Sequence, residues 1–426
     1  MSNRRSFLQT SAALLAGSLV ADIGYANTIK LKNDPLKVGL VGCGGRGTGA
    51  AMQALQADPG TVITALGDVF SGQIDQALHE LSVEHPDRVK VDKTNRFVGF
   101  DAYKKVIASG VDVVLLATPP AFRPQHFADA VAAGKHTFCE KPVAIDEPGV
   151  RMVLEATKKA KEKNLAVVSG FCYRYEFAKR AFYDKIAGGD IGKIVSVSTT
   201  RNGGPLGSKV KEAGWTDMEY RLKNWLYYTW LSGDFICEMM VHSLDLMSWA
   251  MGDRMPIRAT GTGGRQVRVQ EIFGNVYDHF AIEYEYADAV KAYHFSRQQE
   301  GCSNTNHVHI AGTEGVGYIE NGPGLHRISG KNNWTYSGET NNMYDTQHQE
   351  LFASIRNGKP INDGEKMANS SMLGVLGRMV AYTGQTLTWE EAMASTEVVG
   401  PPMDQYSRNL KWTDHGIAKP GITKFL

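Results

Sequence analysis

The chain has 426 residues, which suggests two or three domains at about 150 residues each, and its 42% hydrophobic content excludes a wholly disordered protein. The 46 lysines and arginines almost balance the 45 acids, so the charge indicates neither a nucleic-acid nor an anionic-membrane partner. The five cysteines contain no Cys-x-x-Cys pair, so they indicate neither a disulfide scaffold nor a cysteine zinc knuckle.

Residues 1–26 are expected to be a signal peptide. Arg4-Arg5 is followed by a short apolar run over residues 12–21 and then by small residues. These features are typical of a signal peptide, and the run is too short to span a membrane. The arginine pair resembles a twin-arginine signal, with an ordinary Sec signal as the alternative. We therefore expect a periplasmic or otherwise exported protein with no membrane anchor after processing.

A dinucleotide-binding fingerprint opens the mature chain. Residues 36–41 form an apolar run typical of a buried strand, and residues 48–57 are typical of a helix. Between them lies a Gly-x-Gly-x-x-Gly turn, which permits a tight bend, close approach of the backbone to a pyrophosphate and close helix packing. The N–H groups of the helix N-terminus can bind the phosphates. The cofactor-binding candidates here are Gly42, Gly44, Gly45, Arg46 and Gly47.

An acid at the end of the next strand indicates which dinucleotide is bound. The strand is predicted over residues 62–66, and Asp68 follows 24 residues after Gly44. A carboxylate at this place suits the two ribose hydroxyls, and no arginine follows at once to bind a 2′-phosphate. We therefore predict NAD as the cofactor, with NADP less favoured. The alternative is that Asp68 is a helix N-cap or a loop acid.

Further strands alternate with helices up to residue 175, which predicts a doubly wound parallel sheet in an NAD-binding Rossmann domain over residues 27–185. Ligands gather at the carboxyl ends of such strands. A lysine beside a nicotinamide can bind a substrate hydroxyl and transfer its proton, but it can also be an exposed surface lysine. The residues at these strand ends that we expect at the cofactor are Thr118, Pro119, Glu140, Lys141 and Arg174.

After residue 190 the predicted strands follow one another with short turns and without full-length helices. This pattern predicts an open, mostly antiparallel sheet in a C-terminal α+β domain over residues 186–426. Its face can cover the nucleotide site or form a homo-oligomer interface. Two late helices are predicted as packing elements, over residues 346–357 and 365–383. The strands are predicted over residues 192–199, 257–269, 279–286, 290–296, 308–311 and 315–319.

The segment before that sheet combines acids with a histidine at helical spacing. Glu238 and His242 are four residues apart, on one face of a predicted helix, and Asp245 lies three residues further on that side. A carboxylate one turn from a histidine can orient it or share its proton, as in a general acid/base pair. The alternatives are half of a metal site and an ordinary core histidine.

Substrate contacts are predicted for Tyr175, Tyr228 and Trp230, which can form an aromatic wall for a sugar ring or can be ordinary core aromatics. Asp245 joins these substrate-side candidates. His307 and His309 lie on one face of a strand, but no acid or cysteine is placed beside them, so we predict no metal site.

In this order, these motifs resemble the glucose–fructose oxidoreductase/inositol dehydrogenase/MocA family over residues 36 to about 390. The resemblance implies a Rossmann domain, a C-terminal open β-sheet domain, and hydride transfer between a nicotinamide and a sugar or polyol carbon. It also implies that Lys141 contacts the reacting hydroxyl and that His242 is the catalytic histidine. Glu238 stands where that family usually has an aspartate, one methylene shorter, and we include it among the catalytic candidates. Asp245 matches a further acid common in that family, for which the resemblance implies a structural or orienting role.

Three functions fit the motifs. The first is an NAD(P)-dependent oxidoreductase of a small carbohydrate or polyol, with a tightly held cofactor because no dependable NAD pool exists outside the cytoplasm. The second is an NAD-dependent glycoside hydrolase that oxidises C3, eliminates the aglycone, adds water and reduces the ketone again. The third is a non-catalytic sugar or nucleotide sensor, against which the presence of both Lys141 and His242 argues.

Overall fold

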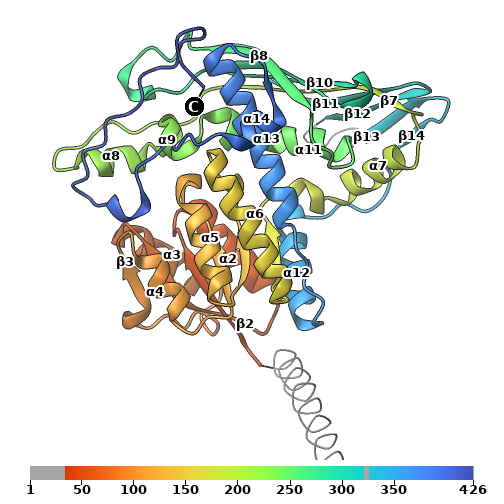
Figure 1. Ribbon diagram of the computed structural model, residues 1–426. Helices are drawn as coiled ribbons and strands as arrows, with labels where there is room; N and C mark the ends of the chain where they lie inside the picture. The colour runs from red at the N-terminus through yellow and green to blue at the C-terminus, as the bar shows by residue number, and fades with distance from the viewer. Residues whose placement is uncertain (1–33, 321–325, 426) are drawn as a thin grey trace, which may run out of the picture.

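The computed structural model describes residues 34–320 and 326–425, which fold around two β-sheets (Figure 1). The predicted signal peptide lies outside the described residues. Among the residues that are described, no helix is long and apolar enough to cross a membrane.

The first sheet is the predicted parallel, doubly wound sheet. Its spatial order is β3-β2-β1-β4-β5-β6, and every pairing is parallel. The chain changes direction across the sheet between β1 and β4, which is where sheets of this kind bind ligands. The strands are β1 (Leu36–Val41), β2 (Thr61–Asp68), β3 (Arg96–Val98), β4 (Val113–Leu116), β5 (His136–Cys139) and β6 (Val167–Ser169).

Helices connect these strands and bury their apolar faces on the sheet. In α2 the small residues Ala50, Ala51 and Ala54 are fully buried, which allows this helix to lie close to the strands. The strands themselves are almost continuous apolar runs, because helices cover both faces of such a sheet. The helices are α2 (Gly45–Ala57), α3 (Ser71–Glu84), α4 (Ala102–Ala108), α5 (Arg123–Ala132) and α6 (Glu147–Glu162).

The second sheet has the order β14-β13-β12-β11-β7-β10-β9-β8-β15. Only β7 and β10 pair in parallel, so the predicted mostly antiparallel sheet is confirmed. The short strands β3, β13, β14 and β15 were not predicted. The strands are β7 (Ile194–Gly203), β8 (Arg258–Gly264), β9 (His279–Glu285), β10 (Lys291–Gln298), β11 (Thr305–Gly312), β12 (Gly315–Glu320), β13 (His326–Gly330), β14 (Trp334–Thr335) and β15 (Leu387–Thr388).

One face of this sheet is packed and the other is open. On β9 the alternate residues Phe280, Ile282 and Tyr284 are buried, toward the side covered by helices α11 (Val241–Ala250) and α13 (Gly364–Thr383). The remaining helices are α7 (Phe177–Ala187), α8 (Asp217–Lys223), α9 (Thr229–Ser232), α10 (Phe235–Glu238), α12 (Met343–Arg356) and α14 (Trp389–Ala394).

Helix α13 joins the two sheets and confirms the second predicted late helix (Figure 1). Its Ser371 Oγ accepts a hydrogen bond from Val143 N at 3.1 Å, and its Arg378 Nη1 donates to Ile145 O at 2.6 Å. Both backbone groups belong to the turn after β5, two and four residues beyond Lys141. Helix α12, the first predicted late helix, packs instead on α2 of the Rossmann unit.

Candidate active site

The glycine turn has the conformation that the fingerprint requires. Gly42 has φ +91°, which glycine adopts without strain, and a Cβ at Gly47 would lie 1.8 Å from the Gly42 carbonyl oxygen. Helix α2 begins directly after Gly44 without a side-chain cap, so the N–H groups of its first turn are available to a phosphate. The turn can therefore cradle a pyrophosphate.

A cavity of about 250 Å³ opens beside this turn, at the carboxyl ends of the strands. Asp68 lies at it, with Oδ2 accepting from Cys43 N at 2.7 Å and Oδ1 from Phe70 N at 2.9 Å. Burial raises the pKa of Asp68, while these N–H groups act in the opposite direction. The predicted cofactor residues that line the cavity are Gly42, Gly44, Asp68, Thr118 and Pro119. Their glycines and acid fit a dinucleotide.

Arg46, in the first turn of α2, forms an ion pair with Glu140, which directly follows β5. Arg46 Nε lies 2.6 Å from Glu140 Oε1, and its guanidinium lies over the ring of Tyr344, at 5.3 Å from the centroid. Gly170 makes room for this acid, because a Cβ there would lie 2.5 Å from Glu140 Oε2. The ion pair connects α2 to the end of β5, and neither residue is among those that line the cavity.

Lys141, directly after Glu140, contacts Glu238 at the end of α10, in the half of the chain that forms the second sheet and its helices. Its Nζ donates to the carbonyl oxygen of Glu238 at 2.5 Å and lies 3.0 Å from Glu238 Oε1. The two side chains are only 13% and 14% exposed. Lys141 is therefore not an exposed surface lysine, and the structure brings together two of the three predicted catalytic residues.

His242 completes this group at the start of α11. Its Nδ1 is buried without a hydrogen-bond partner among the described residues, and its ring lies 5.1 Å from that of Tyr173. Burial lowers the pKa of His242 well below its ordinary value, and the charges of Lys141 and Arg201 lower it further. The imidazole is neutral near pH 7, as a proton acceptor must be.

The prediction of one helix through Glu238 and His242 is wrong. Helix α10 ends at Glu238 and α11 begins at Val241. Met240 N donates to Phe235 O, five residues back, which widens the turn between the two helices. The acid and the histidine are therefore carried by two short helices, and each is oriented by its own packing.

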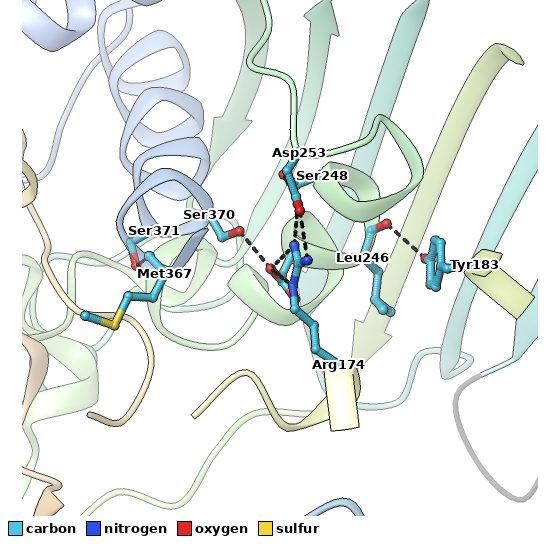
Figure 2. Close-up of polar contacts among 9 residues, drawn as sticks. Arg174, Tyr183, Leu246, Ser248, Asp253, Met367, Ser370 and Ser371 are labelled. Carbon is cyan, nitrogen blue, oxygen red and sulfur yellow. Dashed lines mark hydrogen bonds and ion pairs between the residues drawn. The ribbon is translucent and has the colours of Figure 1, made fainter. Parts of the chain in front are cut away.

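Arg174 contacts carboxylates rather than a cofactor, which corrects its predicted role. Its Nε donates to both oxygens of Asp245 at 2.9 and 3.0 Å, and its Nη2 donates to Asp253 Oδ1 at 2.6 Å (Figure 2). Burial lowers the pKa of Arg174, but the two acids outweigh it and raise the pKa above its ordinary value. Asp245 also accepts from Ser370 Oγ of α13 at 2.7 Å, so it is a buried structural acid and not a substrate contact.

The three predicted aromatic substrate residues are core residues. The Tyr175 hydroxyl donates to Asp363 Oδ2 at 2.6 Å, and its ring is buried in the Rossmann core. Tyr228 and Trp230 are buried in an apolar cluster around Tyr406, and Trp230 is 1% exposed. Because their rings are covered by protein, none of them offers a face to a sugar.

Sequence reasoning missed four residues that line the cavity from the second unit. These residues are Lys209, Leu222, Lys223 and Trp225, in the segment between β7 and α9. They belong to no recognisable motif, so no local signal in the sequence identifies them.

Over residues 34–320 and 326–425 no group of three or more His, Cys, Asp or Glu side chains is arranged to bind a metal.

Family models match both halves of the chain. Residues 36–171 match an oxidoreductase family with an NAD-binding Rossmann fold, and residues 180–317 match the Gfo/Idh/MocA C-terminal domain. The chain belongs to the Gfo/Idh/MocA oxidoreductase family. Inositol 2-dehydrogenase from Klebsiella pneumoniae strain 342 is 25% identical over 218 residues, which cover 51% of this chain and 55% of that protein. The chain thus matches about half the length of this curated relative.

Two solved structures share the fold of this Gfo/Idh/MocA chain. An aldose-aldose oxidoreductase from Caulobacter crescentus, solved with glycerol, aligns with a TM-score of 0.66 and 18% identity, covering 83% of this chain and 99% of that one. Apo scyllo-inositol dehydrogenase from Lactobacillus casei aligns with a TM-score of 0.63 and 18% identity, covering 84% and 99%. At these identities the likeness establishes the two-domain architecture.

Replacing Arg174 by methionine is expected to reduce the free energy of unfolding by about 3–5 kcal/mol, because Asp245 would be left buried without its counter-charge. Urea unfolding followed by circular dichroism measures this loss. The matched control is Arg258→Met, whose half-exposed ion pair with Glu285 is worth at most about 1 kcal/mol. Equal losses in both variants, or a stable Arg174→Met protein that no longer binds NAD, would contradict the structural role.

Proposed function

We propose that this protein is an NAD-dependent oxidoreductase that moves hydride to or from a hydroxyl carbon of a carbohydrate or polyol. The observation that carries the proposal is the meeting of Lys141, Glu238 and a neutral His242 after β5. The cavity beside the glycine turn opens at the carboxyl ends of strands of the same sheet. Both solved neighbours, by name, act on aldoses or inositol. The substrate class is therefore a polyhydroxylated small molecule.

In the proposed reaction, bound NAD supplies the hydride acceptor. His242 accepts the hydroxyl proton of the substrate, because its neutral ring has a nitrogen lone pair available near pH 7. Lys141 stabilises the developing alkoxide with its ammonium group, in a site from which most water is excluded. Glu238 balances the charge of Lys141 and fixes the direction of its Nζ through two contacts.

Asp68 favours NAD over NADP. Its carboxylate lies at the cavity where the adenosine ribose is expected, and a negative charge there repels a 2′-phosphate. The glycine turn accommodates the pyrophosphate of either cofactor, so this acid carries the preference.

We also propose that the protein is exported through the twin-arginine pathway and forms a homo-oligomer. Arg4-Arg5 and the apolar run behind it support export of a folded, cofactor-loaded chain. The open face of the second sheet supports association with a second copy, because the stacked rings of Tyr293 and Phe295 lie there and Phe295 is exposed.

Purified protein, given no added nucleotide, is expected to reduce its bound NAD once when a free sugar or polyol is supplied. Absorbance at 340 nm should rise to the amount of bound cofactor, and an added carbonyl sugar should reverse it. Release of aglycone from aryl glycosides with no lasting change at 340 nm would contradict the oxidoreductase and indicate a redox-neutral glycoside hydrolase. Bound NAD confirmed by mass spectrometry, with no response to either substrate, would indicate a sensor.

Lys141→Met and His242→Ala are each expected to lower kcat by at least about a hundredfold, because each removes a positioned proton acceptor or charge from the transition state. Both variants should retain bound NAD, since neither residue lines the nucleotide cavity. The controls Lys105→Met and His79→Ala change exposed residues of the same types. Near-normal turnover in either active-site variant would refute the assigned role.

The pH profile of alcohol oxidation tests the neutral histidine. Because the pKa of His242 is lowered, kcat/KM should fall only below the ordinary histidine pKa of about 6.5 as the pH is decreased. Arg201→Met removes one of the charges that lower this pKa, so it should move the acid limb to higher pH. An acid limb at or above pH 6.5 in the unmodified protein would contradict the proposal.

A further inference from the structure

The nucleotide cavity has a second wall that comes from the C-terminal unit. Lys209, Leu222, Lys223 and Trp225 line the same cavity as Asp68, although more than 140 residues separate them from it in the chain. Leu222 and Lys223 belong to α8, and Trp225 lies two residues after its end. The wall therefore depends on how α8 is held against the Rossmann unit.

The C-terminal tail holds α8 in place. Arg221 of α8 pairs with Asp414 at 2.5 Å, and Glu219 of α8 lies 3.7 Å from Arg408 Nη1. Arg408 Nη2 also donates to the carbonyl oxygen of Val69 at 3.2 Å, in the loop that carries the cavity lining after β2. One arginine of the tail thus connects α8 to the Rossmann unit. Figure 1 shows the blue C-terminal segment running past α8 toward β3.

Tyr406 of the same tail packs against two phenylalanines that line the cavity. Its ring lies 4.8 Å from that of Phe122 and 5.7 Å from that of Phe100, and both phenylalanines line the cavity. Trp230 packs on its other side at 6.0 Å. The tyrosine is 9% exposed, so opening the wall requires exposing an aromatic ring to water.

The chemistry of the wall suits one part of a dinucleotide. Lys223 Nζ lies 4.9 Å from the centre of the Phe70 ring and 4.3 Å from that of Trp215, which keeps its charge beside aromatic faces. Lys223 and Phe70 both line the cavity. Trp225 adds a half-buried aromatic lining residue. Ammonium groups attract the pyrophosphate, and aromatic rings stack on a purine base. Asp68, which lines the same cavity from the Rossmann side, offers carboxylate oxygens to the ribose hydroxyls.

We propose that the strap, made of residues 205–228 and 400–415, closes over the adenosine end of the dinucleotide and retains it between turnovers, with Lys223 and Trp225 as cofactor-binding residues. This proposal rests on the proposed function, since it takes the cavity as the dinucleotide site. The strap keeps the cofactor bound by adding contacts that must all be broken before the adenosine end can leave.

The test measures the dissociation rate of NAD from the full-length mature protein. The double variant Arg221→Ala, Arg408→Ala breaks both ion pairs of the strap and removes no fully buried side chain. Labelled NAD is loaded and chased with excess unlabelled NAD. The double variant should release it about tenfold faster, as expected for the loss of two partly exposed pairs. Arg258→Ala, the matched control on the second sheet, should stay within about twofold of the unmodified protein.

Lys223→Met and Trp225→Ala test the direct contacts, and each should weaken NAD binding and speed the release of labelled NAD in the same chase experiment. Hydrogen exchange provides a measurement without substitution, in which the NAD-loaded protein should exchange more slowly over residues 217–228 and 403–415 than the protein stripped of its cofactor. Release from the double variant at the unmodified rate, or no protection of these residues, would overturn the strap. An unmodified protein that binds no NAD at all would instead overturn the proposed function.

Discussion

The ammonium group of Lys141 is the charge around which the two units are joined. It is carried by the turn after β5, and its counter-charge comes from Glu238, 97 residues later in the chain. Both side chains are largely removed from water, and an unpaired charge in such a place is strongly unfavourable. The carboxyl edge of the parallel sheet and helix α10 must therefore meet at this point, and the position of the candidate active site follows from that meeting.

Other polar contacts also fix the positions of the two parts of the chain relative to each other. Arg174, after β6, pairs with Asp245 of α11, the helix that also carries His242. Ser370 and Ser371 of α13 bind Asp245 and the backbone of Val143, so one helix contacts both the helix that carries His242 and the turn that carries Lys141. These contacts fix the elements that carry Lys141 and His242 relative to each other.

The second unit also encloses the far end of the cofactor cavity. Lys141 and Glu238 meet after β5, while residues of α8, which is held by the C-terminal tail, line the cavity together with Asp68. The proposed retention would suit a reaction in which NAD is reduced and reoxidised in place.

The sequence by itself determined the parallel sheet, the glycine turn, Asp68 at its strand end and the catalytic candidates Lys141 and His242. These features depend on short-range patterns: apolar runs, glycines at required spacings and residues at strand ends. Only the tertiary structure decided the roles of Arg174, Tyr175 and Trp230, because whether such a side chain meets a ligand or a buried partner depends on residues tens to hundreds of positions away. The break between Glu238 and His242 and the strap over the cavity were decided there for the same reason, since packing and long-range ion pairs leave no local pattern in the chain.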